Sequence, residues 1–184
     1  MDRQREYDPE RLAELIMYVA QRSLGDPRFG STKLNKILFF ADFEAYRRTG
    51  QSITGATYQH LPQGPCPHQL LPVIDSELAG DARWVERSTY AGTQRQLIPL
   101  REARVELFTG PEVAIIEEVL TELMPLTNSQ VSQRSHETVA WRLTNRLDEI
   151  PYGMALLSNE PPTEDDLSWL EGVEGGESLE ASTR

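Results

Sequence analysis

The sequence predicts an α+β domain that is predominantly helical, with several helices packed around one buried helix and a small antiparallel β-element beside them. Three observations support this fold class. Residues 32–49 are apolar around most of a helical circumference, which is typical of a helix enclosed by its neighbours. Several other segments combine helix start signals with apolar residues at helical spacing. Two strand-like runs flank a glycine-containing loop, which indicates a hairpin.

The first two helices have recognisable ends. Asp8-Pro9 predicts the start of the first helix, with Asp8 as N-cap and the proline at the first helical position. Gly25 is predicted to end this helix. The central helix is predicted to be capped by Ser31 or Thr32 and to end at Gly50.

The next segment combines a short strand with a proline-rich turn. Residues 53–59 are predicted to form a strand that is interrupted at Gly55, where the backbone is expected to bulge. Residues 62–67 contain three prolines, so they are predicted to form a stiff turn and neither a helix nor a central strand. A helix is predicted for residues 69–78, with Leu71 among its inward-facing side chains.

The second half of the chain is predicted to add a hairpin and two further helices. Strands 83–89 and 94–100 form the expected hairpin. Thr109 and Glu112 have the spacing of a capping box that starts a helix. A short helix capped by Thr127 or Asn128 is expected to follow and to reach about residue 136, and residues 150–152 are expected to form an extended link.

Bulk composition places most of the charge at one end of the chain. The 184 residues are 39% apolar, enough to bury a core, and the net charge is −11. Residues 158–184 contain eight acidic side chains and one basic side chain, so they alone carry −7. We therefore expect a globular domain at 1–157, an acidic C-terminal helix at 158–171 and a disordered tail at 172–184.

The net charge, the length of the apolar runs and the cysteine count indicate which partners and which location to expect. Net negative charge disfavours nucleic acid as a partner, and no apolar run is long enough to span a bilayer. The single cysteine excludes an internal disulfide and suggests a reducing compartment, so a cytoplasmic location is expected.

Three motifs in order make the chain similar to a known family. They are Thr32-Lys33-Leu34-x-Lys36-Ile37-Leu38-Phe39-Phe40-Ala41-Asp42-Phe43, then Gly50-x-x-Ile53-Thr54-Gly55-x-x-Tyr58, then Gly64-Pro65-x-Pro67. Further along, Val131-Ser132-x-x-Ser135-His136, Trp141 and Ile150-Pro151-Tyr152 also agree. Together they resemble the Panacea domain, the antitoxin SocA-like family of bacterial and phage toxin–antitoxin systems, over residues 8–157. Cys66 departs from the family pattern, in which valine or isoleucine is usual.

The resemblance implies a small, mostly helical domain without enzymatic activity or cofactor. It implies that the protein neutralises a cognate toxin by direct protein–protein binding, in the setting of phage defence. The alternative that the family allows is an adaptor that delivers the toxin to a Clp-type protease. Residues expected to be structural are Leu34, Phe39, Phe40, Ala41, Gly55, His136 and Trp141.

Three groups of residues are candidates for contact with a partner. Lys33 and Lys36, at the start of the central helix, either form a solvated outer face, point at an acidic partner, or pair with carboxylates. The turn either contributes to an interface, where its stiffness lowers the ordering cost, or only redirects the chain; its residues are Gln63, Gly64, Pro65, Cys66, Pro67 and His68. In the segment Thr163–Leu170, Asp165, Asp166 and Trp169 either bind a partner, dock on the domain or only aid solubility.

Catalytic and metal-binding alternatives have weaker sequence support. His60, Cys66, His68 and His136 are the residue types that bind zinc, but their spacing matches no zinc pattern. A Cys66–His136 nucleophile pair would need the two side chains to meet, which the sequence does not indicate. We instead expect His136 to hydrogen-bond the backbone in a packed joint. No P-loop, dinucleotide-binding or serine-hydrolase motif is present.

Overall fold

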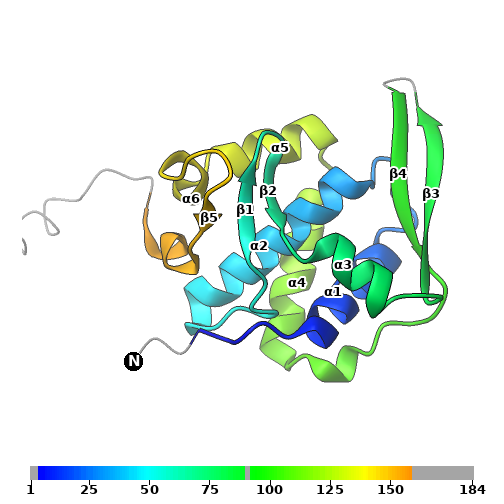
Figure 1. The fold of residues 1–184 in the computed structure, drawn as a ribbon, viewed down its shortest axis with the longest axis horizontal. Helices are drawn as coiled ribbons and strands as arrows, with labels where there is room; N and C mark the ends of the chain where they lie inside the picture. The colour runs from blue at the N-terminus through cyan, green and yellow to red at the C-terminus, as the bar shows by residue number, and fades with distance from the viewer. Residues whose placement is uncertain (1–3, 90–91, 159–184) are drawn as a thin grey trace, which may run out of the picture.

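The computed structural model describes residues 4–89 and 92–158, and it confirms a helix-dominated α+β fold (Figure 1). The helices and strands follow in the order α1 (Pro9–Arg22), α2 (Ser31–Thr49), β1 (Tyr58–Leu61), β2 (Gly64–Pro67), α3 (Leu70–Ser76), β3 (Ala82–Thr89), β4 (Gly92–Pro99), η1 (Val105–Leu107), α4 (Gly110–Leu123), α5 (Asn128–His136), α6 (Val139–Arg142), β5 (Glu149–Ile150) and η2 (Tyr152–Leu156). The predicted acidic helix and tail, with Asp165, Asp166 and Trp169, lie outside the described residues.

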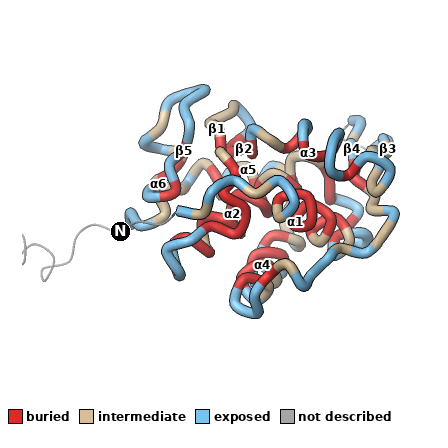
Figure 2. Tube along the Cα trace, turned by 60° about the horizontal axis from the view of Figure 1, so that its bottom comes forward, coloured by how far each residue is buried: buried red, intermediate tan, exposed pale blue. Residues whose placement is uncertain are grey.

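Helix α2 is the centre of the core, as its circumferential apolarity predicts. It runs through the middle of the domain and contacts α1, α4, α5, β2 and η2 (Figures 1 and 2). Leu34, Phe39 and Ala41 are at most 1% exposed, while Phe40 is half-buried against the same core. Each face of the helix is therefore covered by a different element.

The ends of the first two helices match the predictions in part. Asp8 caps α1 by accepting the N–H of Arg11 at 3.1 Å, but α1 ends at Arg22, before the predicted stop at Gly25. The predicted cap of α2 by Ser31 or Thr32 is wrong, because Gly30 occupies the N-cap. Strand β4 packs directly on that glycine, where a Cβ would lie 2.7 Å from Gln94 Cγ.

The strand predicted at residues 53–59 forms only at its end. Strand β1 begins at Tyr58, and the preceding N–H groups of Ile53 and Thr54 donate to the Asp42 carboxylate at 2.8 and 2.9 Å. These donors are therefore occupied by a side chain of α2 and make no strand ladder. At Gly55 the φ is +70° and a Cβ would lie 2.5 Å from Glu6 O, so this position favours glycine.

Asp42 is the hub of a buried polar cluster beneath this loop. Besides the two N–H groups, its carboxylate accepts the hydroxyls of Thr54, Tyr58 and Tyr152 at 2.5, 2.8 and 3.3 Å. Burial raises the pKa of Asp42, and the hydrogen bonds oppose that rise. The cluster joins α2, the 52–58 loop and η2 through one side chain.

The proline-rich segment forms a strand, where only a turn was predicted. Strand β2 pairs antiparallel with β1, from Tyr58 opposite Pro67 to Leu61 opposite Gly64. The sheet order is β2-β1-β5, so β2 is an edge strand and its prolines leave no gap in a central ladder. The predicted link at 150–152 is divided: Ile150 pairs with Tyr58 in β5, and η2 starts at Tyr152.

The remaining elements enclose the other side of α2. The hairpin β3–β4 is confirmed, and β4 packs against α1 and α2. Helix α3 buries Leu70, Val73 and Ile74, so the inward position predicted for Leu71 is wrong, and that side chain is 53% exposed.

Both predicted capping features near α4 and α5 are present, at Thr109 with Glu112 and at Thr127. Within residues 4–89 and 92–158, no helix has the length and hydropathy needed to cross a membrane.

Candidate partner-binding site

The two lysines predicted as partner contacts are both buried, so the solvated outer face is wrong. Lys33 is 0% exposed, and its ammonium donates to Asp26 Oδ2 at 2.6 Å and to Met124 O at 2.8 Å. Lys33 thus follows the third alternative, pairing with a carboxylate. Lys36 is 1% exposed, and its ammonium donates to Pro65 O at 3.0 Å. The C-terminal end of α4 and strand β2 cover this face of α2.

The predicted contact turn is also largely internal. Gly64, Pro65 and Pro67 are buried and Cys66 is half-buried, which leaves Gln63 and His68 as its exposed members. The Cys66 Sγ is 3.7 Å from Pro67 O, and burial raises the pKa of the thiol. A raised pKa is the opposite of what a cysteine nucleophile requires. No cluster of three or more potential metal ligands exists in the described ranges 4–89 and 92–158.

His60 and His136 meet on one indole. The imidazole of His60 stacks on Trp141 with centroids 3.3 Å apart, and that of His136 stacks on it at 4.3 Å. His60 Nδ1 lies 3.0 Å from Thr144 Oγ1, whereas His136 Nε2 is buried without a partner. The predicted backbone hydrogen bond of His136 is therefore wrong, and ring stacking holds that joint together. Trp141 thus contacts one histidine from β1 and one from α5.

These stacked imidazoles predict a pH dependence of stability. Burial lowers the pKa of both His60 and His136 below 6.5. The unfolded chain therefore takes up protons first as the pH falls, so this part of the stability is complete above pH 6.5 and is lost below it. We expect the melting temperature to fall between about pH 7 and about pH 5. Calorimetry of a His60→Asn/His136→Asn variant should show a smaller fall, and an equal fall would contradict this explanation.

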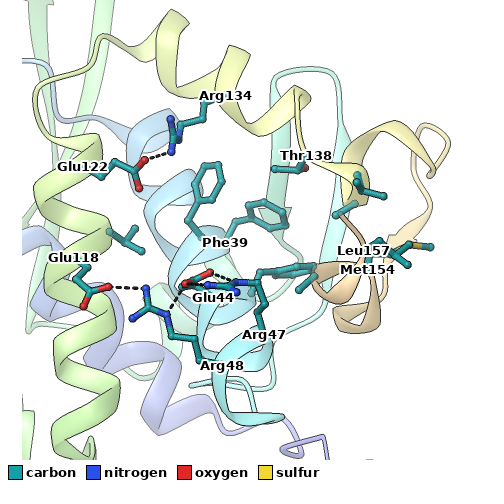
Figure 3. A pocket seen from close by; sticks show the side chains of 16 residues that line it. Phe39, Glu44, Arg47, Arg48, Glu118, Glu122, Arg134, Thr138, Met154 and Leu157 are labelled. Atoms are coloured by element: carbon teal, nitrogen blue, oxygen red, sulfur yellow. Dashed lines mark hydrogen bonds and ion pairs between the residues drawn. The ribbon is translucent and has the colours of Figure 1, made fainter. Parts of the chain in front are cut away.

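One hollow on the described surface is a groove floored by aromatic side chains of α2, which we call the aromatic groove (Figure 3). Its cavity volume is about 360 Å³. The rings of Phe39, Phe40 and Phe43 form the floor, and α4, α5, α6 and η2 supply the walls. The Phe39 centroid lies 5.3 Å from that of Phe40 and 4.3 Å from that of Phe43. Since these rings continue into the core, the floor is preformed and rigid.

Charged pairs surround this apolar floor. Arg48 bridges Glu44 at 2.5 Å and Glu118 at 2.6 Å, and Arg47 also pairs with Glu44 (Figure 3). Arg134 pairs with Glu122 across the groove's upper rim. Exposed pairs of this kind contribute little to stability and exchange partners readily. The rim can therefore interact with charges of either sign on an incoming molecule.

Exposed leucines extend the apolar surface beside the groove. Leu157, which lines the groove at the end of η2, is 51% exposed, and the adjacent Leu156 is 63% exposed. Apolar surface gathered around a groove is a common mark of a protein-binding site.

The groove was not predicted from sequence, because its floor residues were assigned to the core alone. Phe39 and Phe43 are indeed buried, but their rings also line the groove. The available signal was the charged run Glu44, Arg47 and Arg48, which follows the aromatic residues directly. Recognising it needed the walls, which come from segments as distant as residue 157.

Comparison with known proteins gives one match. The family model described as "Antitoxin SocA-like, Panacea domain" matches residues 34–142, more than half of the chain and a narrower range than the 8–157 predicted. The match includes the groove floor and the walls from α4, α5 and α6. No curated protein and no solved structure matches the chain.

Proposed function

The chain belongs to the antitoxin SocA-like family with the Panacea domain, and we propose from this premise that it neutralises a cognate toxin by binding it directly. The proposed action takes place in the cytoplasm and needs no enzymatic step. The family membership points to an antitoxin role, and the structure offers a surface suited to protein binding.

The observation that carries the proposal is the aromatic groove. Its rigid phenylalanine floor can accept apolar side chains of the toxin without a large ordering cost. The paired charges on its rim can re-pair with charged residues that flank the toxin's apolar contact. We propose that the toxin inserts an apolar segment between α4 and η2, with the exposed leucines widening the contact.

Blocking the groove should abolish neutralisation without unfolding the protein. Ala155 is half-buried on the groove wall in η2, so Ala155→Arg places a long cationic side chain into the space that the toxin would fill. The expected result is loss of growth rescue when the variant is coexpressed with the toxin encoded by the neighbouring gene. Leu24→Arg is the matched control, since Leu24 is 48% exposed and does not line the groove.

Two outcomes would contradict the proposal in different ways. Failure of the native chain to rescue growth or to copurify with that toxin would remove the antitoxin assignment. Equal rescue by Ala155→Arg, with a circular dichroism spectrum matching the native chain, would remove the groove as the binding site. Rescue that disappears in a strain lacking Clp proteases would replace direct neutralisation by the adaptor mechanism.

A further inference from the structure

The two lysines of this chain have the same burial but different electrostatic surroundings. Lys33 has a countercharge, because its ammonium pairs with Asp26 at 2.6 Å. Lys36 donates one hydrogen bond, to the neutral carbonyl of Pro65, and in the described part of the chain it makes no ion pair. A buried charge without a countercharge is costly, and proteins usually compensate it. The structure therefore contains an ammonium whose countercharge is missing.

Lys36 lines a cavity of about 320 Å³ beside the first turn of α2, which we call the α2 cavity. Ser31, Thr32 and Asn35 line it from the same helix. Gln63, in the turn between β1 and β2, and Gly64, at the start of β2, line it from the other side. Asn35 and Lys36 therefore line the same cavity.

Two further features make the α2 cavity suited to an anion. Gly30, the N-cap of this 19-residue helix, provides no side chain to accept the first-turn N–H groups. Ser31 and Thr32 in this first turn line the α2 cavity, so the positive end of the helix dipole lies beside it. Independently, the Oδ1 of Asn35 is buried and has no hydrogen-bond partner, although the residue as a whole is half-buried. An unpaired acceptor beside an ammonium without a countercharge indicates that a polar group with a hydrogen-bond donor is missing at this position.

We propose that the α2 cavity binds an oxyanion, a carboxylate or phosphate group, with Lys36 as its counterion. The N–H groups at the start of α2 would donate to the anion, and Asn35 Oδ1 would accept a hydrogen bond from an O–H or N–H group of the same molecule. The source is either a small free anion or an acidic side chain of the toxin; the second source rests on the proposed function. The site is separate from the aromatic groove, because the two share no lining residue.

The charge state of Lys36 supports this chemistry near neutral pH. Burial lowers the pKa of Lys36 to about 8, and the titratable side chains that face it are Cys66 and His136. Lys36 is therefore mainly cationic at pH 7 and loses its charge as the pH rises through about 8. Anion affinity should decrease over that same interval.

The test compares the native chain with Lys36→Met, which keeps the side-chain length and removes the charge. Inorganic phosphate and acetate are titrated into each protein while amide NMR shifts of Ser31 and Thr32 are followed. We expect saturable shifts in the native chain and affinity weaker by roughly tenfold or more in Lys36→Met, since a charge-assisted hydrogen bond is lost. Arg87→Met removes an equal charge from an exposed position on β3 that lines neither the α2 cavity nor the aromatic groove, and this variant should bind anions as the native chain does.

Thermal melting gives a second, independent result. In buffer without added phosphate or acetate, Lys36→Met should melt at a higher temperature than the native chain, because an uncompensated buried charge is gone. A lower melting temperature would mean that Lys36 serves the Pro65 contact alone, and it would overturn the proposal. Absence of saturable shifts in the native chain, or equal shifts in Lys36→Met, would overturn it as well.

The two sources are separated by the toxin complex. If an acidic toxin side chain fills the α2 cavity, Lys36→Met weakens toxin binding and phosphate competes with the toxin. If a free anion fills it, toxin binding is unchanged in Lys36→Met and phosphate binds the complex as it binds the free protein. The phosphate titration needs no toxin. It can therefore contradict the anion site without contradicting the antitoxin function, and the growth-rescue experiment can contradict the antitoxin function without contradicting the anion site.

Discussion

Asp42→Ala should destabilise the fold by about 3–5 kcal/mol, because it leaves buried donors without an acceptor. The carboxylate is fully buried and accepts the N–H groups of Ile53 and Thr54, for which the fold offers no substitute. Each unsatisfied buried donor costs about 1–3 kcal/mol, and the removed side chain also leaves a cavity. Urea unfolding followed by circular dichroism measures the change.

Asp42→Asn is the matched control for this prediction. Its amide oxygen can still accept the two N–H groups, and the hydroxyls of Thr54 and Tyr58 can rotate to accept from its NH₂ group. The loss of stability should therefore be clearly smaller than for Asp42→Ala. Equal losses would mean that the negative charge itself holds the loop, and a loss below about 1 kcal/mol for Asp42→Ala would contradict the proposed role.

Gly64→Ala should cost about 2–4 kcal/mol, the second largest effect expected. Gly64 has φ +105°, a conformation that residues with a Cβ rarely adopt. The added methyl would lie 2.3 Å from Lys36 Cε and 2.5 Å from Ser135 Oγ. To move aside, Lys36 would have to give up its hydrogen bond to Pro65 O.

A control variant and a double variant separate the backbone strain at Gly64 from the steric clash of the added methyl group. Gly153→Ala should be nearly neutral, because no atom lies within 4 Å of its Cβ position and its φ is not positive. Adding Lys36→Ala to Gly64→Ala should recover the part of the loss caused by the Lys36 clash and leave the Ser135 clash and the backbone strain. Additive effects in this double-mutant cycle would show that the Lys36 contact is not the origin of the clash.

The parts of the fold that could be predicted from sequence are those governed by nearby residues. The caps at Asp8 and Thr109 depend on a side chain and an N–H group three residues away. The buried position of α2 follows from its own composition, which is apolar on nearly every face. Such features need no knowledge of what lies elsewhere in the chain.

Several of the errors share a different cause, which is a partner distant in sequence. The strand predicted from residue 53 is replaced by a loop because Asp42, 11 residues earlier, takes the N–H of Ile53. The solvated outer face, one of three alternatives for Lys33, is wrong because Met124, 91 residues later, accepts from its ammonium. The aromatic groove likewise requires walls from four elements that only the folded chain brings together.

The hydroxyl of Tyr152 has a consequence for the order in which the protein is assembled during synthesis. It joins η2 to Asp42 on α2, 110 residues earlier in the chain, and to Ala56 O at 2.7 Å. Because domains generally fold as units during synthesis, this contact can form only after residues 152–157 have left the ribosome. A ribosome-bound chain that stops before Tyr152 lacks the η2 wall of the aromatic groove, so the groove is completed late in translation.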